Sequence, residues 1–263
     1  MIRSLTASSI PSNVPEDSQD VLIVGGGVIG LCCGWYLSKA GYKVTILDRD
    51  PTRKSACSDE NAGMVVPSHF IPLAAPGVIS QGLKWMLNPK SPFYMRPRLD
   101  PALWSWCWKF FRHANVRHVE NSKHILSTIS LESRRLFLEL ADELNFNLKT
   151  CGLMMLCQTE AGLEEEAEVA SMAAEVGVQA EVCNAGRVRE LDPEVRMDVV
   201  GGVWFEQDCH LDPLEFMEEL RRGIREREGT FLDDEAKDFI RQGNQLTAVE
   251  TAKGERLKAD WFV

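Results

Sequence analysis

The residues best placed to do chemistry in this chain form a glycine-rich turn, Gly25-Gly26-Gly27-Val28-Ile29-Gly30, followed later by an acid at Asp48. In such a turn Gly25 permits a tight bend, Gly27 lets the backbone approach a pyrophosphate, and Gly30 lets a helix pack closely on a strand. Free N–H groups at the start of that helix favour negative charge. The carboxylate of Asp48 can accept hydrogen bonds from both hydroxyls of a ribose. The pattern predicts that the chain binds a dinucleotide.

The elements around this turn occur in the order that dinucleotide binding requires. Residues 21–24 are a short apolar run typical of a buried parallel strand. Residues 28–40 form an almost wholly apolar helix, and residues 43–47 form the next strand. Asp48 therefore lies at the ~20-residue offset of a dinucleotide-binding βαβ unit, and it would repel the 2′-phosphate of NADP. The alternative is a glycine turn in an unrelated α/β fold.

A second loop, residues 58–63, follows this unit and favours FAD over NAD. It supplies small groups, one hydroxyl and one side-chain amide, and could return to the pyrophosphate and then run beside a flat ring system. The alternative is an ordinary solvent-exposed loop. Together the two loops predict these cofactor-binding residues: Gly25, Gly26, Gly27, Val28, Ile29, Gly30, Asp48, Arg49, Ser58, Asn61, Ala62 and Gly63.

The middle of the chain predicts a mixture of helices and short strands. A proline-rich stretch with little regular structure occupies residues 64–100, and residues 101–147 look mainly helical. Aromatic residues crowd the first of those helices, which indicates core packing, with contact to a partner domain as the alternative. Further on, strands are expected at 153–157 and 202–205, and helices at 160–176 and from about Ala185.

The last fifty residues resume the helix-then-strand order of the first part. Asp212 as N-cap and Pro213 at the first helical position predict a helix that runs to about Glu228. Strands are expected at 230–241, 245–252 and 256–263, joined by hairpin turns at 242–244 and 253–255.

We therefore expect an α/β protein whose Rossmann-like dinucleotide-binding domain, of the glutathione-reductase type, contains an inserted α+β domain. The predicted division is a flexible arm at 1–19, the first part of the binding domain at 20–100, a partial substrate domain at 101–208, and the second part of the binding domain at 209–263.

Composition narrows the classes of partner. With 29 Lys and Arg against 39 Asp and Glu, the formal net charge is −10, which disfavours a nucleic-acid binder. Eight cysteines without a C-x-x-C pair indicate reduced thiols rather than disulfides, and the histidines lack ligand spacing, so no metal is expected. No stretch predicts a secretory signal or a transmembrane segment. We expect a cytoplasmic protein, with the periphery of the inner membrane as the alternative.

Several motifs together resemble the D-amino-acid dehydrogenase branch of the D-amino-acid oxidase superfamily. They are the region 20–50, the Ser58–Gly63 loop, the run Pro67-x8-Pro76-Gly77 with Leu83-Lys84-Trp85-Met86, and the later run from Gly201 through Asp212-Pro213 and Leu220 to Gly229. The resemblance covers about residues 20–263. It implies a two-domain enzyme with FAD as its cofactor. It assigns Gly25, Gly27, Gly30 and Asp48 to the adenosine and pyrophosphate half of FAD, and the Ser58, Asn61, Ala62 and Gly63 loop to the region near the pyrophosphate and the flavin.

The resemblance also implies an activity. Relatives oxidise the Cα–N bond of a small-molecule D-amino acid by hydride transfer to the flavin, giving a 2-oxo acid and ammonia, and pass the electrons to a quinone or another acceptor. No side-chain base is required, so we assign no catalytic residue. The alternatives are a related flavin enzyme acting on glycine, sarcosine, D-hydroxyproline or a 2-hydroxy acid, and an inactive flavin-binding fragment.

The end of the sequence departs from the family pattern. Relatives continue from a strand like Ala259–Val263 into a small-residue turn, and later supply the arginine that binds the substrate carboxylate and a last flavin-contacting loop. We therefore read the sequence as truncated and expect residues 1–263 alone to lack amine dehydrogenase activity.

Overall fold

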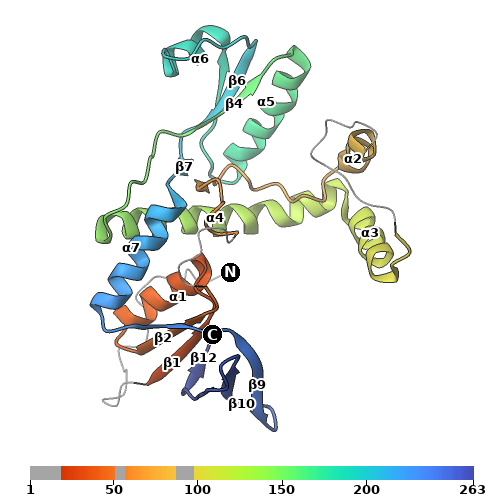
Figure 1. The fold of residues 1–263 in the computed structure, drawn as a ribbon. Helices are drawn as coiled ribbons and strands as arrows, with labels where there is room; N and C mark the ends of the chain where they lie inside the picture. Colours follow the sequence, from red (N-terminus) through yellow and green to blue (C-terminus); the bar gives the residue numbers. More distant parts are fainter. Residues whose placement is uncertain (1–18, 51–56, 87–97) are drawn as a thin grey trace. The chain divides into compact units, whose positions relative to one another are not determined.

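The computed structural model describes residues 19–50, 57–86 and 98–263. The chain divides into two compact units (Figure 1). Unit 1 comprises Met1–Gly63, Leu140–Asn147 and Leu211–Val263, and unit 2 comprises Met64–Glu139 and Leu148–His210. The predicted flexible arm lies outside the described residues, apart from its last one. The predicted domain boundaries at residues 100 and 208 stay a prediction.

Unit 1 is built on a parallel sheet with the strand order β12-β1-β2-β8. Strands β1 (Asp20–Val24) and β2 (Lys43–Asp48) confirm the two strands predicted around the glycine turn. The other two strands, β8 (Thr230–Asp233) and β12 (Trp261–Phe262), come from the far end of the sequence and run parallel to them. Sequence segments more than 200 residues apart therefore form one sheet.

Two helices of unit 1 pack against each other, α1 (Val28–Lys39) and α7 (Pro213–Glu226). Trp35 of α1 is buried against Gly223 of α7, where an added Cβ would lie 2.3 Å from the indole ring. Helix α7 begins as predicted: Asp212 accepts hydrogen bonds from two first-turn amides, at 2.8 and 3.3 Å, and Pro213 follows it. The buried face of α7 thus fixes the orientation of the other side chains on this helix.

The strands predicted after α7 are corrected by the structure. The expected strand 230–241 is two strands, β8 and β9 (Ala236–Gln242), which separate at an acidic turn. The expected strand 256–263 is likewise split into β11 (Arg256–Leu257) and β12. Strands β9, β10 (Gln245–Thr251) and β11 form an antiparallel sheet, so both predicted hairpins are confirmed. A single long strand is ruled out because β8 and β12 join a different sheet from β9 and β11.

Unit 2 contains an antiparallel sheet with the order β4-β6-β5 (Leu153–Cys157, Gly201–Phe205 and Glu181–Asn184). Helix α5 (Glu160–Glu175) packs on this sheet, and Phe70, Ala173, Val203 and Phe205 form its buried core. Helix α6 (Ala185–Leu191) follows β5, a strand that the sequence did not predict. A second small pairing joins β3 (Met64–Val65) to β7 (Cys209–His210).

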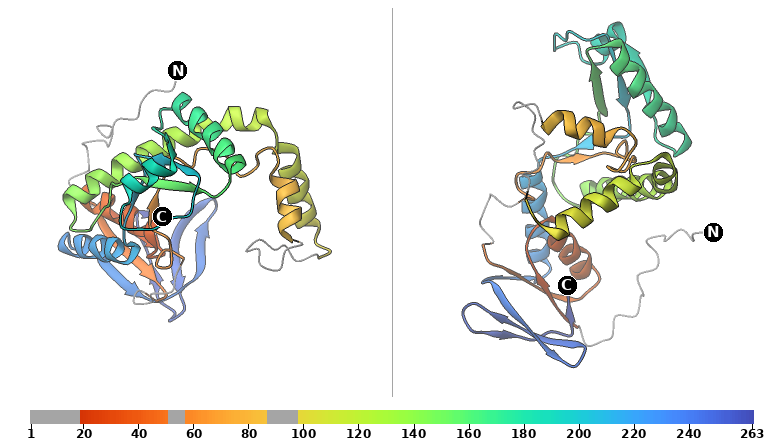
Figure 2. Two further views of the ribbon diagram at one scale, coloured as in Figure 1. Left: turned by 90° about the horizontal axis from the view of Figure 1, so that it is seen from above. Right: turned by 90° about the vertical axis from the view of Figure 1, so that its right-hand side faces the viewer.

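The other helices of unit 2 are α2 (Val78–Met86), α3 (Pro101–His113) and the first part of α4 (Val116–Glu143). Helices α2 and α3 lie to one side of the β4-β6-β5 sheet in Figure 1 and in the left view of Figure 2. Neither helix has a buried residue among those described. No helix in the described ranges is long and apolar enough to cross a bilayer.

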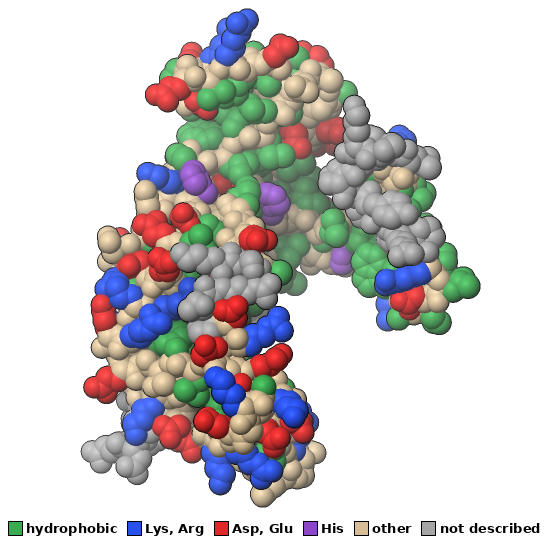
Figure 3. Space-filling model, in the orientation of Figure 1, with side chains coloured by type: hydrophobic (Ala, Val, Ile, Leu, Met, Phe, Trp, Pro, Cys, Tyr) green, Lys and Arg blue, Asp and Glu red, His purple; other side chains and the backbone are tan. Residues whose placement is uncertain are grey.

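Most aromatic residues of α3 are exposed, with Phe110 half-buried, which corrects the prediction of core packing. Trp104, Trp108 and Phe111 follow helical spacing and are 61%, 61% and 58% exposed, and Trp106 is 52% exposed. Hydrophobic side chains are visible over this helix in the space-filling view (Figure 3). The aromatic residues of this run lie on more than one face of the helix. The sequence therefore does not indicate which face, if any, packs against another element.

Candidate functional site

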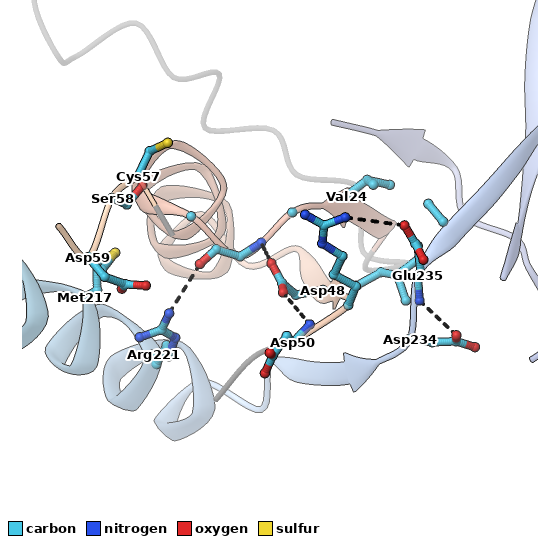
Figure 4. Close-up of a pocket in the computed structure, with 16 residues that line it drawn as sticks. Val24, Asp48, Asp50, Cys57, Ser58, Asp59, Met217, Arg221, Asp234 and Glu235 are labelled. Carbon is cyan, nitrogen blue, oxygen red and sulfur yellow. Dashed lines mark hydrogen bonds and ion pairs between the residues drawn. The ribbon is translucent and has the colours of Figure 1, made fainter. Parts of the chain in front are cut away.

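A pocket of about 520 Å³ opens at the carboxyl end of the parallel sheet in unit 1 (Figure 4). This is the edge of a parallel sheet at which ligands of open α/β proteins usually bind. Five segments line the pocket: the end of β1 with the glycine turn, the end of β2 with the residues after it, the loop before β3, one face of α7, and the turn that leads into β9. Its lining residues are Val24, Gly25, Gly26, Gly27, Leu47, Asp48, Arg49, Asp50, Cys57, Ser58, Asp59, Met217, Arg221, Asp234, Glu235 and Ala236.

The glycine turn has the geometry that its sequence predicts. Gly25 has φ +107°, a conformation that side chains disfavour, and its N–H donates to the carbonyl of Leu47 at 2.8 Å. At Gly30 a Cβ would lie 1.9 Å from the carbonyl oxygen of Gly25. Any side chain at Gly30 would therefore push the start of α1 off the turn, and the N-terminal amides of α1 would leave the pocket.

Asp48 is held in place by two backbone amides. One carboxylate oxygen accepts the Gly26 N–H at 2.5 Å, and the other accepts the Asp50 N–H at 2.9 Å. These bonds bring the acid at the end of β2 against the glycine turn at the end of β1 (Figure 4). A carboxylate has about four acceptor sites, so capacity for further donors remains.

The Ser58 loop reaches the start of α1. The Ser58 hydroxyl oxygen accepts the Val28 N–H at 3.1 Å, which satisfies one of the free amides of the first helical turn. An added Cβ on Gly27 would lie 3.2 Å from that same oxygen. The structure therefore brings the first and second predicted loops together in one place.

The pocket collects only part of the predicted set. Gly25, Gly26, Gly27, Asp48, Arg49 and Ser58 line it, whereas Val28, Ile29, Gly30, Asn61, Ala62 and Gly63 do not. Ile29 is 78% exposed, and Gly30 has a packing role instead. The Asn61 side chain accepts the Gly63 N–H at 2.8 Å and thereby shapes its own loop. Gly63 has φ +68° and lies against the carbonyl of Leu211.

Sequence reasoning missed the contributions of α7 and β9. Met217 and Arg221 lie one turn apart on α7 and both reach the pocket, and the Arg221 guanidinium donates to the carbonyl of Gly26 at 3.4 Å. In the turn just before β9, Glu235 forms an ion pair with Arg49 at 3.6 Å. Helical spacing could have shown that Met217 and Arg221 share a face. It could not have shown what that face meets.

The residues present fit a dinucleotide. Glycines at 25, 26 and 27 leave the backbone open, and the amino end of α1, where the macrodipole favours anions, faces the same place. Asp48 lies at the end of the second strand, the position from which the acid of a βαβ unit of this kind binds the ribose of the dinucleotide. Among the described residues, no group of three or more His, Cys, Asp or Glu could hold a metal ion.

Comparison with known families agrees with this site and fold. The chain matches the FAD dependent oxidoreductase family over residues 20–263, and it belongs to that family. FAD is therefore the cofactor of the family in which the glycine turn and Asp48 occur, as the sequence predicted.

Among curated proteins, the chain is 30% identical over 250 residues to a D-amino acid dehydrogenase of Agrobacterium fabrum, covering 93% of this chain and 60% of the relative. A D-amino acid dehydrogenase of Vibrio cholerae gives 30% identity, with 93% and 59% covered. The chain thus spans about 60% of the length of these relatives. The resemblance to this branch of the family is confirmed.

Solved structures share the fold at low sequence identity. Glycine oxidase from Geobacillus kaustophilus has a TM-score of 0.65 at 18% identity, with 93% of this chain and 55% of that chain covered. An FAD-bound L-alpha-glycerophosphate oxidase from Mycoplasma pneumoniae has a TM-score of 0.60 at 15% identity, with 93% and 52% covered. At such identities the likeness concerns the fold alone, and it confirms the predicted α/β class.

Proposed function

We propose that this chain carries the FAD-binding site of an oxidoreductase that converts D-amino acids to 2-oxo acids and ammonia. The observation that carries the proposal is the meeting of the glycine turn, Asp48 and Ser58 at one end of a parallel sheet, in a chain of the FAD dependent oxidoreductase family. The similarity to curated D-amino acid dehydrogenases supports the substrate class.

In this proposal the residues of unit 1 bind and orient the cofactor. The backbone of Gly25–Gly27 and the start of α1 hold the pyrophosphate, and Asp48 accepts hydrogen bonds from the ribose. Ser58 fixes the loop that closes over them, through its bond to the Val28 N–H. Bound flavin supplies an acceptor for the hydride released from the substrate Cα. We assign no catalytic side chain.

The remaining parts of the prediction extend this proposal. Unit 2, which contains most of the inserted region 101–208, is our candidate for the substrate side. The substrate is a D-amino acid, and the electrons pass to a quinone or another acceptor. The cytoplasmic location, with the inner-membrane periphery as its alternative, also stays a prediction, which cell fractionation tests.

Flavin binding by the purified 263-residue chain tests the cofactor part. We expect bound FAD to survive gel filtration and to show a quenched flavin fluorescence, and we expect NADP⁺ not to compete with it, because Asp48 repels a 2′-phosphate. A chain that is folded by circular dichroism and yet shows no saturable FAD binding would contradict the proposal.

The substrate part is tested by exchange with a relative. Residues 20–263 would replace the matching part of the Agrobacterium fabrum D-amino acid dehydrogenase, of which they cover 60%. We expect D-alanine and other D-amino acids to bleach the flavin of this hybrid under anaerobic mixing. Glycine, sarcosine, D-hydroxyproline and 2-hydroxy acids are the comparison substrates. Preference for one of these, with no bleaching by D-amino acids, would move the protein to another branch of the family.

A further inference from the structure

The pocket of unit 1 has an unusual charge for a site that takes a pyrophosphate. Five of its described lining residues are acids and two are arginines, Arg49 and Arg221. Two negative phosphate groups that enter an acid-lined pocket are stabilised by a cation that adds to the dipole of α1. We propose that Arg221 binds the pyrophosphate of the dinucleotide. This inference rests on the proposed FAD site and adds to it a residue from a different part of the chain.

Helix α7 holds the backbone of Arg221 in place. Phe216, Leu220 and Ile224 are at most 2% exposed and anchor one face of the helix in the core of unit 1. Arg221 follows Leu220 directly and, with Met217 one turn earlier, reaches the pocket. Figure 4 shows its guanidinium pointing from α7 toward the glycine turn. The side chain thus starts from a rigid support.

The guanidinium already lies at the glycine turn but is weakly bound there. Its Nη2 donates to the Gly26 carbonyl at 3.4 Å, near the upper limit for a hydrogen bond. A guanidinium has five N–H donors in a planar fork that matches phosphate oxygens. The Gly26 contact uses one of these donors, and a charged acceptor at the same turn would form stronger bonds.

The charge of Arg221 is available, in contrast to the neighbouring arginines. Arg49 is paired with Glu235, and Arg222 is paired with Glu219 at 2.5 Å and with Glu226 at 2.6 Å. Further along α7, Arg225 lies over the ring of Phe231 at 4.7 Å. Within the part of the chain that the structure describes, Arg221 forms no ion pair. It is therefore the arginine of α7 best placed to take an anion.

The test compares the wild type, Arg221→Gln and Arg222→Gln. The last variant removes the same charge from the next position of α7, but Arg222 does not line the pocket and is held in ion pairs. Isothermal titration measures binding of FAD, ADP and adenosine to each protein. We expect Arg221→Gln to weaken FAD and ADP by about 10- to 100-fold, the usual effect of losing a hydrogen bond to a charged group. Adenosine, which has no phosphate, should bind equally to the wild type, Arg221→Gln and Arg222→Gln.

A salt series gives a second readout. ADP binding to the wild-type chain should weaken as sodium chloride rises, and this dependence should be smaller in Arg221→Gln than in Arg222→Gln. Arg221→Lys keeps the charge without the fork, so it should retain the salt dependence at reduced affinity. This variant also keeps the test meaningful where Arg221→Gln fails to fold.

The outcomes separate the two proposals. A wild-type chain that binds neither FAD nor ADP overturns the proposed function. A wild-type chain that binds both, with an Arg221→Gln variant of unchanged ADP affinity and salt dependence, overturns the role of Arg221 alone. Equal weakening of ADP and adenosine also overturns it, because Arg221 would then only support the Gly26 turn.

Discussion

At the scale of single residues, Asp48 combines two tasks. Its carboxylate accepts the Gly26 and Asp50 amides, which fixes the shape of the pocket, and it faces the place of the ribose in the proposed complex. A charge-assisted hydrogen bond to a ligand hydroxyl stabilises binding more than a neutral one does. The same side chain thus links the sheet edge to the cofactor.

We predict that Asp48→Ala weakens FAD binding by about 1–3 kcal/mol, because it removes charge-assisted hydrogen bonds to the ribose. Riboflavin, which has no adenosine half, should bind the variant and the wild type equally. Fluorescence titration with both ligands measures the difference. Unchanged FAD affinity, in a variant whose fold is intact by circular dichroism, would count against the assignment of Asp48.

A second residue of interest, Asp208, lies in unit 2 and is fully buried. Its carboxylate accepts the Ser68 hydroxyl at 2.6 Å and the Ser68 N–H at 3.1 Å. Burial raises the pKa of Asp208, while the bonds to Ser68 and the nearby charges of His69 and Arg134 act in the opposite direction. The ionised carboxylate is therefore disfavoured in the folded protein relative to the unfolded chain.

This burial predicts a pH-dependent stability. Because the folded pKa lies above the unfolded one, Asp208 lowers the free energy of unfolding as pH rises from the unfolded pKa, about 4, through the raised folded pKa. Asp208→Asn removes this dependence and keeps an acceptor for the Ser68 N–H. We expect the stability of the variant relative to the wild type to increase with pH across that window. Urea unfolding at several pH values measures it, and parallel curves would refute the prediction.

At the scale of elements, the close approach of α1 to the glycine turn and to strand β2 of the parallel sheet determines whether the pocket exists. Gly30 and Gly34 are the helix residues that permit it: a Cβ would lie 1.9 Å from the Gly25 carbonyl oxygen at Gly30, and 3.0 Å from Ile46 at Gly34. Helix α1 has no side-chain cap at its N-terminus, where Ser58 instead accepts the Val28 N–H. The start of α1 is thus set by backbone packing and by one loop.

We predict that Gly30→Ala lowers the free energy of unfolding by about 1–3 kcal/mol, the usual cost of overpacking, and reduces FAD binding with it. The clash is with backbone, which cannot move aside as a side chain can. Gly162→Ala is the matched control in the first turn of α5, since its added Cβ meets only the Thr159 hydroxyl, at 3.2 Å. Urea denaturation and FAD titration check both variants. Equal stability of the two would show that the turn relaxes easily.

At the scale of the whole molecule, charged and apolar surfaces are unevenly distributed. Acidic and basic side chains intermingle over unit 1 in the space-filling view (Figure 3), consistent with the formal net charge of −10. In unit 2, by contrast, α2 and α3 contain no acidic residue and expose large apolar side chains. Exposed large apolar side chains that gather on one helix favour association.

We predict that the purified 263-residue chain self-associates through α3. The double variant Trp104→Gln/Trp108→Gln removes two exposed rings from one helix face and should lower the associated fraction at a given protein concentration. Lys109→Gln, on the same helix, is the control that changes charge and keeps the rings. Sedimentation velocity over a range of concentrations measures the effect. Identical association in all three proteins would place the contact elsewhere.

The sequence by itself determined the local parts of this protein. Residues 20–48 form the predicted strand, glycine turn, helix, strand and terminal acid. Each of these depends on contacts between residues near in sequence, on the periodicity of apolar residues and on the backbone geometry of glycine. The start of α7 at Asp212 and Pro213 was readable for the same reason. The family resemblance then supplied FAD as the expected cofactor.

Tertiary structure alone decided which distant segments meet. Packing of buried faces decides the strand order β12-β1-β2-β8 and brings Arg221 and Glu235 to the pocket. The apolar periodicity of a helix shows which face is buried, but it does not show which element that face packs against. The same limit explains why Asn61 was expected in the pocket but bonds its own loop. It also explains why the rings of α3 were expected in a core. An apolar run indicates that burial would be favourable, but burial requires another surface that packs against it.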